Sequence, residues 1–276
     1  MTVYPFNIHL GPIEITGYGI MMMVGFLMGG WLIGLELKRR GLNQDYAADF
    51  IIAALIGGVL GAKLWYVALT QDAGALLSRG GLVWYGGFIG GALAVVFNGW
   101  RLKVPARWTM QVAAPALAAG YALGRVGCFL VGDDYGRPTD LPWGVAFPRG
   151  LPPSTAANLA DFRVAIPEGT DPSTVLAVHP TQLYEVTIML VVFALLWTLR
   201  SRERGTGWLF AVYLMLAGLE RFFVEIFRAK DDRFLAGFTI AQLTSVVLIG
   251  IGAYLYRRWR DDRQLAAGAY LSTVKK

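Results

Sequence analysis

The stretch that organises this sequence reads Gly124-Arg125-Val126-Gly127-Cys128-Phe129-Leu130-Val131-Gly132-Asp133-Asp134-Tyr135-Gly136-Arg137. It begins near the end of a long apolar run and finishes in a polar segment rich in turn residues. Arg125 therefore lies where an apolar helix approaches a membrane surface. An arginine at the centre of a membrane helix costs roughly 2.5–3.5 kcal/mol on insertion scales, so it persists where it faces a partner, a ligand or a wet cavity.

Two glycines flank this arginine, and the absence of their side chains lets backbone or ligand come close. Gly124 precedes Arg125 and Gly127 follows it by two positions. Two interpretations remain open. In the first, Arg125 extends toward the membrane surface and the glycines serve helix packing. In the second, the three residues belong to an anion site in the outer half of the membrane.

The composition is that of a membrane protein. Of 276 residues, 55% are hydrophobic and 16% are charged, whereas soluble domains carry about 25% charged residues. The single cysteine excludes an internal disulfide, and the scattered positions of His9, Cys128 and His179 predict no metal site. The net charge of +6 is explained below by topology rather than by nucleic-acid binding.

The apolar runs predict an all-α protein with seven transmembrane helices, because each run approaches the roughly 20 residues that span a bilayer. Their approximate ranges are 15–37, 47–69, 82–98, 108–131, 181–199, 207–228 and 238–256. Residues 132–178 are rich in proline and too long for a simple connection. We expect them to form a small extracytoplasmic cap with short strands near 143–147 and 162–166. The chain then divides into 1–131, 132–178, 179–259 and a cytoplasmic tail, 260–276.

The distribution of lysine and arginine predicts the orientation. With the N-terminus outside, fifteen of these residues lie in cytoplasmic segments and six lie outside, which agrees with the positive-inside rule. The six outer residues are Arg79, Arg137, Arg149, Arg163, Lys230 and Arg233.

This orientation brings polar residues to one depth in the outer leaflet. Arg125 lies about 9 Å and Arg221 about 10 Å below the outer ends of their helices, at a rise of about 1.5 Å per residue. Three inward-running helices carry polar residues at their outer ends, namely Tyr18, Tyr85 and the pair Tyr184-Glu185. Such a shared level indicates one site.

The segment from Glu220 to Arg228 supplies further charges to this level. Arg221, Glu225 and Arg228 are spaced to share a helix face. One interpretation is an ion-pair ladder that makes the charges tolerable. Because Glu225 neutralises only one arginine and Arg125 has no evident partner on this face, we also expect an excess of guanidinium groups, with Glu185 as a candidate partner for one of them. Such an excess suits a phosphate, which arginine binds bidentately. His179 is expected to be a hydrogen-bonded anchor before the helix that starts at Thr181.

The combination of these motifs resembles the bacterial prolipoprotein diacylglyceryl transferases over essentially the whole chain. The resemblance rests on residues 124–137, on His179-Pro180-Thr181-Gln182-Leu183-Tyr184-Glu185, on Tyr18-Gly19, and on Arg221-Phe222 with Glu225 and Arg228. Enzymes of this family reside in the bacterial cytoplasmic (inner) membrane. They move the diacylglyceryl group of phosphatidylglycerol to the lipobox cysteine thiol of a preprolipoprotein. The products are a thioether and glycerol 1-phosphate, and the reaction needs no cofactor or metal.

The resemblance implies that Arg125, Arg221 and Tyr85 are catalytic and that further residues bind substrate. The latter are Tyr18, Gly124, Gly127, Asp133, Gly136, Arg137, Gln182, Tyr184, Glu185, Glu225 and Arg228. The chain also departs from the family pattern. Tyr85 stands where many members have a histidine proposed as a base, Cys128 where many have asparagine, and Asp133 where the family has glutamate.

Other interpretations remain compatible with parts of the sequence. A divergent member could use another acceptor, and a catalytically silent paralogue could bind phospholipid at the same anion site. A lipid or anion transporter would also use membrane arginines, but the sequence has no internal repeat of the kind that many transporters are built on.

Overall fold

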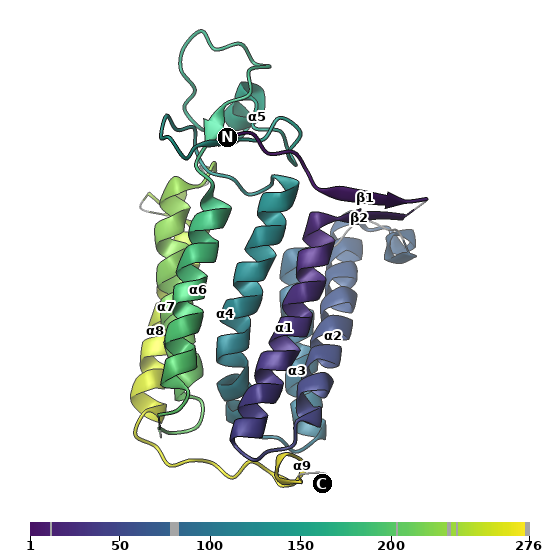
Figure 1. The fold of residues 1–276 in the computed structure, drawn as a ribbon, viewed down its shortest axis with the longest axis vertical. Helices are drawn as coiled ribbons and strands as arrows, with labels where there is room; N and C mark the ends of the chain where they lie inside the picture. Colours follow the sequence, from purple (N-terminus) through teal and green to yellow (C-terminus); the bar gives the residue numbers. More distant parts are fainter. Residues whose placement is uncertain (12, 78–82, 203, 231–232, 236, 274–276) are drawn as a thin grey trace.

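The computed structural model describes residues 1–11, 13–77, 83–202, 204–230, 233–235 and 237–273. Seven long helices in this part of the chain lie side by side in one bundle (Figure 1). They are α1 (Gly17–Arg39), α2 (Asp45–Thr70), α3 (Trp84–Arg101), α4 (Ala106–Val131), α6 (Thr181–Leu199), α7 (Trp208–Val224) and α8 (Ile240–Trp259). The N-terminus lies at one end of the bundle and the C-terminus at the other (Figure 1).

Five of these helices are long and apolar enough to cross a membrane: α1, α2, α4, α6 and α8. The chain is therefore a mostly helical, multi-pass membrane protein. The helices α3 and α7 are shorter, with 18 and 17 residues. The expected start of the third helix at residue 82 and the charge at Arg79 lie outside the described residues.

The helix packing depends on small residues where two helices approach closely. The helix α2 packs on α3 through Gly57 and Gly61 on one side and Gly86 and Gly90 on the other. A Cβ atom at Gly61 would lie 2.3 Å from the carbonyl oxygen of Gly86. Small residues bring membrane helices together in this way, because dispersion contacts rather than water exclusion drive their association. The helix α4 packs on α1, α6 and α7 and so lies at the centre of the bundle.

Short elements surround the bundle. They are β1 (Asn7–Leu10), β2 (Ile13–Thr16), η1 (Ala73–Leu77), β3 (Val145–Ala146), α5 (Ala156–Asp161), β4 (Ala177–Val178), η2 (Glu225–Phe227), β5 (Arg233–Leu235), β6 (Phe238–Thr239) and α9 (Ala269–Ser272). The strands form three antiparallel pairs, β1 with β2, β3 with β4 and β5 with β6. Residues 132–178 lie at the same end of the bundle as the N-terminus (Figure 1).

The strand expected near 143–147 is confirmed by β3, but the strand expected near 162–166 is wrong. Residues after α5 turn back to close that helix instead. The N–H of Val164 donates to the carbonyl of Leu159 and the N–H of Arg163 to that of Ala160. With Arg163 at φ 60°, this is a Schellman motif, which satisfies the last helical carbonyls and prevents an extended chain.

The segment expected to be helical to residue 228 also ends earlier. The helix α7 stops at Val224 and is followed by the 3₁₀ turn η2, after which Arg228 is extended at ψ 144°. This change of backbone redirects Arg228 toward residues 132–178, where its carbonyl accepts a hydrogen bond from Nε of Arg137 at 3.2 Å.

Candidate functional site

The site is built where α4 ends and the chain reverses. Gly132, at φ 70°, ends the helix, and the N–H groups of Gly132 and Asp133 both donate to the carbonyl of Cys128. Asp134 is also left-handed, at φ 57°, a conformation that aspartate tolerates better than most residues. The two left-handed residues, separated by one position, bring the side chain of Asp134 back over Arg125, nine positions earlier.

Arg125 forms two ion pairs and a stacking contact. Its Nη1 lies 2.7 Å from Oδ2 of Asp134, and its Nε lies 2.7 Å from Oε2 of Glu185. The guanidinium also lies over the ring of Tyr121, 5.3 Å from the centroid, and donates to the hydroxyl of that residue at 3.3 Å. The Glu185 side chain is 0% exposed. Arg125 is therefore held in a buried, low-dielectric setting in which charge–charge interactions are strong.

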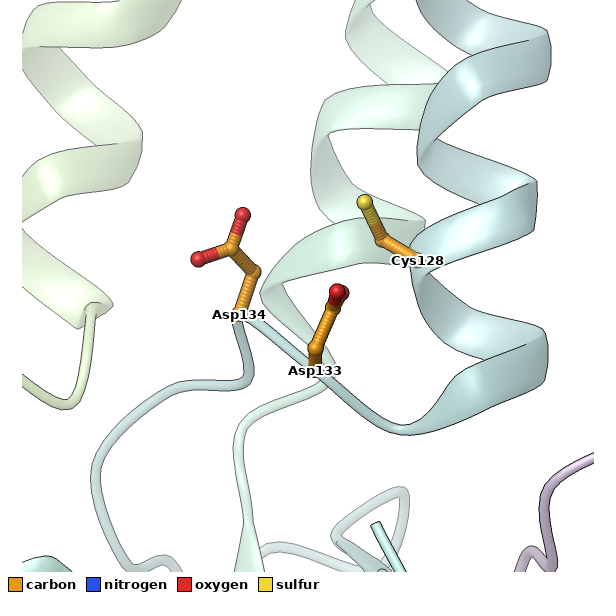
Figure 2. A group of neighbouring side chains, drawn as sticks. All are labelled: Cys128, Asp133 and Asp134. Atoms are coloured by element: carbon orange, nitrogen blue, oxygen red, sulfur yellow. The ribbon is translucent and has the colours of Figure 1, made fainter. Parts of the chain in front are cut away.

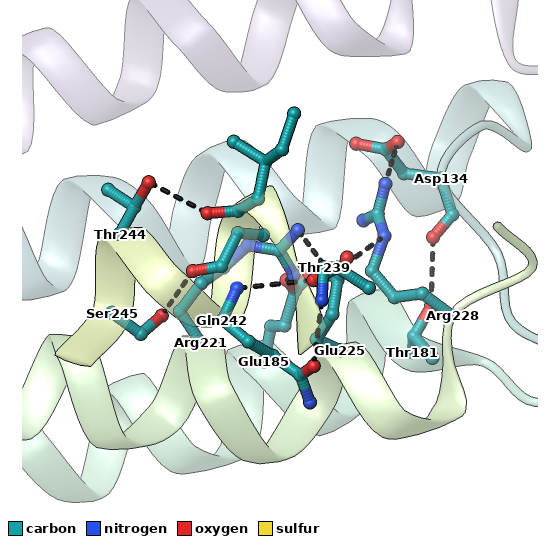
Figure 3. A network of polar contacts seen from close by, with 12 residues as sticks. Asp134, Thr181, Glu185, Arg221, Glu225, Arg228, Thr239, Gln242, Thr244 and Ser245 are labelled. Atoms are coloured by element: carbon teal, nitrogen blue, oxygen red, sulfur yellow. Dashed lines mark hydrogen bonds and ion pairs between the residues drawn. The ribbon is translucent and has the colours of Figure 1, made fainter. Parts of the chain in front are cut away.

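The helix α7 completes the network from the other side (Figure 3). Nη2 of Arg221 lies 2.5 Å from Oε2 of Glu225, and Nη1 of Arg221 lies 3.9 Å from Oε1 of Glu185. Nε of Arg228 is 3.9 Å from Oε2 of Glu225, and Nη2 of Arg228 pairs with Oδ1 of Asp134. The side chains of α4, α6 and α7 thus meet in one cluster, as expected from their shared depth.

The expected excess of guanidinium groups is wrong, because the structure places as many carboxylates as arginines in the cluster. Arg125, Arg221 and Arg228 face three carboxylates, because Asp134 and Glu185 join Glu225. Yet hydrogen-bonding capacity remains. Within the described residues, the buried Nη1 atoms of Arg221 and Arg228 form no hydrogen bond. A buried donor without a hydrogen bond costs about 1–3 kcal/mol, so these N–H groups favour an added acceptor.

Cys128, Asp133 and Asp134 form a group that the sequence analysis did not anticipate (Figure 2). The Cys128 sulfur and one carboxylate oxygen from each aspartate, the atoms that could bind a metal ion, lie within 4.8 Å of one another. Nη1 of Arg125 lies 3.6 Å from Sγ of Cys128 as well as 2.7 Å from Asp134, so a guanidinium already provides the cation here. Burial and the neighbouring Asp134 charge raise the pKa of Asp133 to about 6. Asp133 is therefore mostly charged at neutral pH and becomes protonated when the pH falls below about 6.

The N-terminus of α6 holds the loop after α4 in place. The Thr181 hydroxyl donates to the carbonyl of Asp134 at 2.8 Å, and Nε2 of Gln182 donates to the carbonyl of Asp133 at 2.5 Å. The N–H of Gly136 donates to the carbonyl of His179. A Cβ atom at Gly136 would lie 2.5 Å from the carbonyl oxygen of Phe227. Gly136 and Gln182, predicted to bind substrate, thus have structural contacts that position the loop.

His179 is confirmed as a hydrogen-bonded residue before α6. Its Nδ1 lies 3.0 Å from the Tyr184 hydroxyl, which also accepts from Nε1 of Trp143 at 2.8 Å. Burial lowers the pKa of His179, so its neutral form is favoured at neutral pH. The ring packs against Phe227, with centroids 5.3 Å apart. These contacts link the cap segment to α6 and η2.

The remaining predicted residues lie at different distances from the cluster. Gly127 lets α1 approach, since a Cβ atom there would lie 3.2 Å from Cα of Tyr18. A Cβ atom at Gly124 would meet nothing within 4 Å, so this glycine borders open space.

Tyr85 is 60% exposed on α3, which packs on α2, whereas the ion pairs come from α4, α6, α7 and the flanking segments. Tyr121 and Asp134 were not predicted from the sequence, although Tyr121 precedes Arg125 by one helical turn.

Comparisons with known proteins agree with the motifs. The family model for prolipoprotein diacylglyceryl transferase matches residues 5–258. A phosphatidylglycerol–prolipoprotein diacylglyceryl transferase of Geobacter sulfurreducens is 34% identical over 90% of this chain and 92% of its own length. A protein of the same name from Clostridium tetani is 31% identical over 94% of this chain and 99% of its own length. On the match across nearly the whole chain, this membrane protein belongs to the prolipoprotein diacylglyceryl transferase family.

Proposed function

We propose that this protein is a transferase that moves the diacylglyceryl group of phosphatidylglycerol to the lipobox cysteine of a preprolipoprotein. The observation that carries this proposal is the cluster of Arg125, Arg221 and Arg228, with buried N–H groups on two of them that form no hydrogen bond within the described residues. A phosphate group supplies the acceptors that these N–H groups lack. The names of the related proteins support both substrates.

In the proposed reaction the cysteine sulfur forms a bond to the glyceryl carbon, and the bond from that carbon to the phosphate oxygen breaks. The thiol proton is lost and glycerol 1-phosphate leaves. Charge grows on the departing phosphate, and Arg125 and Arg221 stabilise it because their guanidinium groups are already placed before the reaction begins. The ion pairs to Glu185 and Glu225 hold those two groups in position.

The thiol has an ordinary pKa near 8.5 and reacts as the thiolate, so a proton acceptor helps the reaction. Tyr85 stays our prediction for this step, because it occupies the family position of a proposed base. Binding of substrate by the remaining predicted residues also stays a prediction. They are Tyr18, Gly124, Gly127, Asp133, Gly136, Arg137, Gln182, Tyr184, Glu185, Glu225 and Arg228.

A direct test is to incubate the purified full chain with phosphatidylglycerol and a synthetic lipobox peptide, and to analyse the peptide by mass spectrometry. We expect a mass increase equal to one diacylglyceryl group on the cysteine, and release of glycerol 1-phosphate. A peptide whose cysteine is replaced by serine is the matched control. Binding of phosphatidylglycerol without transfer would favour the silent paralogue.

A divergent acceptor is the second proposal, because Tyr85 and Cys128 both depart from the family pattern. The same assay with a panel of thiol acceptors separates the two proposals. Transfer to another thiol but not to the lipobox peptide would favour the divergent member.

We further propose an inner-membrane location with seven spans, an external N-terminus and cap, and a cytoplasmic C-terminus. A reporter fused after Lys276 is expected to be cytoplasmic, and one inserted at the exposed Ala157 of α5 is expected to be extracytoplasmic. The reason is the fifteen-to-six division of lysine and arginine. Alkaline phosphatase and fluorescent-protein fusions measure the two sides. Finding both reporters on one side would contradict the seven-span topology.

Cys128 is expected to be dispensable for transfer, because the acceptor thiol belongs to the substrate. Cys128 is 8% exposed, and its sulfur lies 3.6 Å from Nη1 of Arg125. Cys128→Ser and Cys128→Asn should keep activity within about tenfold of the unsubstituted protein, against the 10²–10³-fold loss typical of removing a preplaced group. Turnover in the peptide assay measures this. A Cys128 peptide carrying lipid, together with loss of turnover in both variants, would point to a covalent intermediate instead.

A further inference from the structure

We propose that Asp134 acts as an internal substitute for the phosphate of the lipid. In the structure its carboxylate lies between Arg125 and Arg228, and an incoming phosphate displaces it. This inference rests on the proposed function and adds a residue that sets the affinity of the site for its anion. Asp134 lies inside the motif that the sequence analysis emphasised, but neither the predicted site nor the proposed reaction uses it.

The geometry of the carboxylate is that of a bridging anion. Oδ2 of Asp134 lies 2.7 Å from Nη1 of Arg125, and Oδ1 pairs with Nη2 of Arg228. Arg125 belongs to α4 and Arg228 follows η2, so the two guanidinium groups are 103 positions apart in the sequence. Two oxygens of one phosphate would contact the same two groups, because arginine binds carboxylate and phosphate with similar geometry.

The exposure of the three side chains differs in the direction that displacement requires. The Asp134 side chain is 41% exposed, whereas those of Arg125 and Arg228 are 15% and 12% exposed. Of the three side chains, the carboxylate is therefore the one that the protein covers least, and it has room to rotate away from the two arginines. Its backbone stays in place, since the Thr181 hydroxyl holds the Asp134 carbonyl. Displacement thus needs a rotation of one side chain and no refolding of the loop.

The charges show why a second anion must replace the first. When Asp134 leaves, Arg125 retains Glu185 at 2.7 Å, but Arg228 retains only the 3.9 Å contact with Glu225 among its described ion pairs. Nη1 of Arg228 is buried without a hydrogen bond even before that change. Exchange of a carboxylate for a phosphodiester of equal charge preserves neutrality, which matters because an unpaired buried charge is costly.

The ionisation of Asp134 agrees with this exchange. Although burial acts to raise the pKa of its carboxyl, the charges of Arg228 and Arg125 outweigh burial and hold the pKa well below its usual range. The residue is therefore charged at neutral pH and competes with phosphate as one anion against another. Among the ion pairs of the described residues, neighbouring Asp133, with a pKa of about 6, pairs with neither arginine and is a weaker competitor.

An opposite role for Asp134 makes different predictions. If the carboxylate only clamps the two arginines in a productive arrangement, its removal should loosen the site and weaken anion binding. If it is an internal substitute for phosphate, its removal should strengthen anion binding. Neutralising the side chain without changing its size separates these roles.

The test compares Asp134→Asn with the unsubstituted full chain in nanodiscs. The first measurement compares binding of phosphatidylglycerol with binding of phosphatidylcholine, each supplied to the protein in nanodiscs. The second measures binding of inorganic phosphate by calorimetry at constant ionic strength. We expect Asp134→Asn to bind phosphatidylglycerol about tenfold more tightly, which corresponds to one competing charge-assisted contact. Tighter binding of inorganic phosphate as well would identify the phosphate group itself as the competitor; tighter binding of the lipid alone would identify the lipid headgroup. Asp140→Asn is the matched control, because Asp140 is an exposed residue of the same segment.

Stability provides a second measurement if the asparagine variant folds poorly. Asp134→Asn and Asp134→Ala should each show a larger phosphate-dependent rise in Tm than the unsubstituted chain. Equal or weaker binding by both variants, with the unsubstituted chain still transferring lipid, would overturn the inference and leave the proposed function intact. Absence of both lipid binding and transfer by the folded, unsubstituted chain would overturn the proposed function, and the inference with it.

Discussion

Arg125→Ala is expected to lower the turnover of phosphatidylglycerol by about 10²–10³-fold, the usual loss when one preplaced group that stabilises developing charge is removed. Arg125 is the arginine of α4, and it is fixed by Glu185 on one side and by Asp134 on the other. The guanidinium therefore needs little reorganisation when charge develops on the leaving phosphate. Turnover is measured with phosphatidylglycerol and the lipobox peptide under single-turnover conditions.

Arg125→Lys is the informative companion variant. A lysine retains the charge, but its ammonium group cannot reproduce the planar fork that reaches Asp134 and Glu185 at once. We therefore expect partial recovery of turnover. Arg149→Ala is the matched control, since Arg149 is an exposed arginine of the cap segment. Near-normal turnover by folded Arg125→Ala would contradict the anion-site mechanism.

Glu185→Ala is expected to have the largest effect on stability, about 3–5 kcal/mol, the range for removing one partner of a buried ion pair. The Glu185 side chain is 0% exposed, and it is the group that both Arg125 and Arg221 approach, at 2.7 and 3.9 Å. It also accepts a hydrogen bond from the Tyr121 hydroxyl at 3.2 Å. Its loss would remove the carboxylate that Arg125 and Arg221 share, and would leave Arg125 paired with Asp134 and Arg221 paired with Glu225.

Glu185→Gln should retain part of this stability, because its amide oxygen can still accept from Tyr121 or Arg125. Thermal unfolding in detergent, followed by circular dichroism, measures both variants. Glu168→Ala, at an exposed position of the cap, is the control for loss of one glutamate. If Glu185→Ala unfolds at the same temperature as this control, the carboxylate does not hold the three helices together.

The sequence was sufficient to predict the main helices and the family. Long apolar runs require helices in a membrane, because each backbone polar group must be satisfied within the segment. Local signals also placed an end of one helix, since Pro180 and Thr181 predict the start that α6 has. The depth of Arg125 and Arg221 followed from counting residues, and their shared partner Glu185 agrees with that count.

Local sequence was less informative where the chain leaves the helices. Residues 162–166 carry an aromatic and two β-branched side chains, as strands often do, but Arg163 is left-handed and the chain closes α5 instead. The end of α7 at Val224 is likewise set by contacts of the following segment with residues 132–178, not by a helix-breaking residue.

The pairing of charges was decided by the tertiary structure. The sequence determined which ionisable residues lie at one level of the helix bundle, because helix length and rise set their positions along the helices. It did not determine that Asp134 would bridge Arg125 and Arg228. That contact depends on the left-handed backbone at Gly132 and at Asp134, and on the changed direction of the chain at Arg228. Ion pairs form over a few ångströms, and residues 94 positions apart reach that distance only when the loop and both helices have their final arrangement.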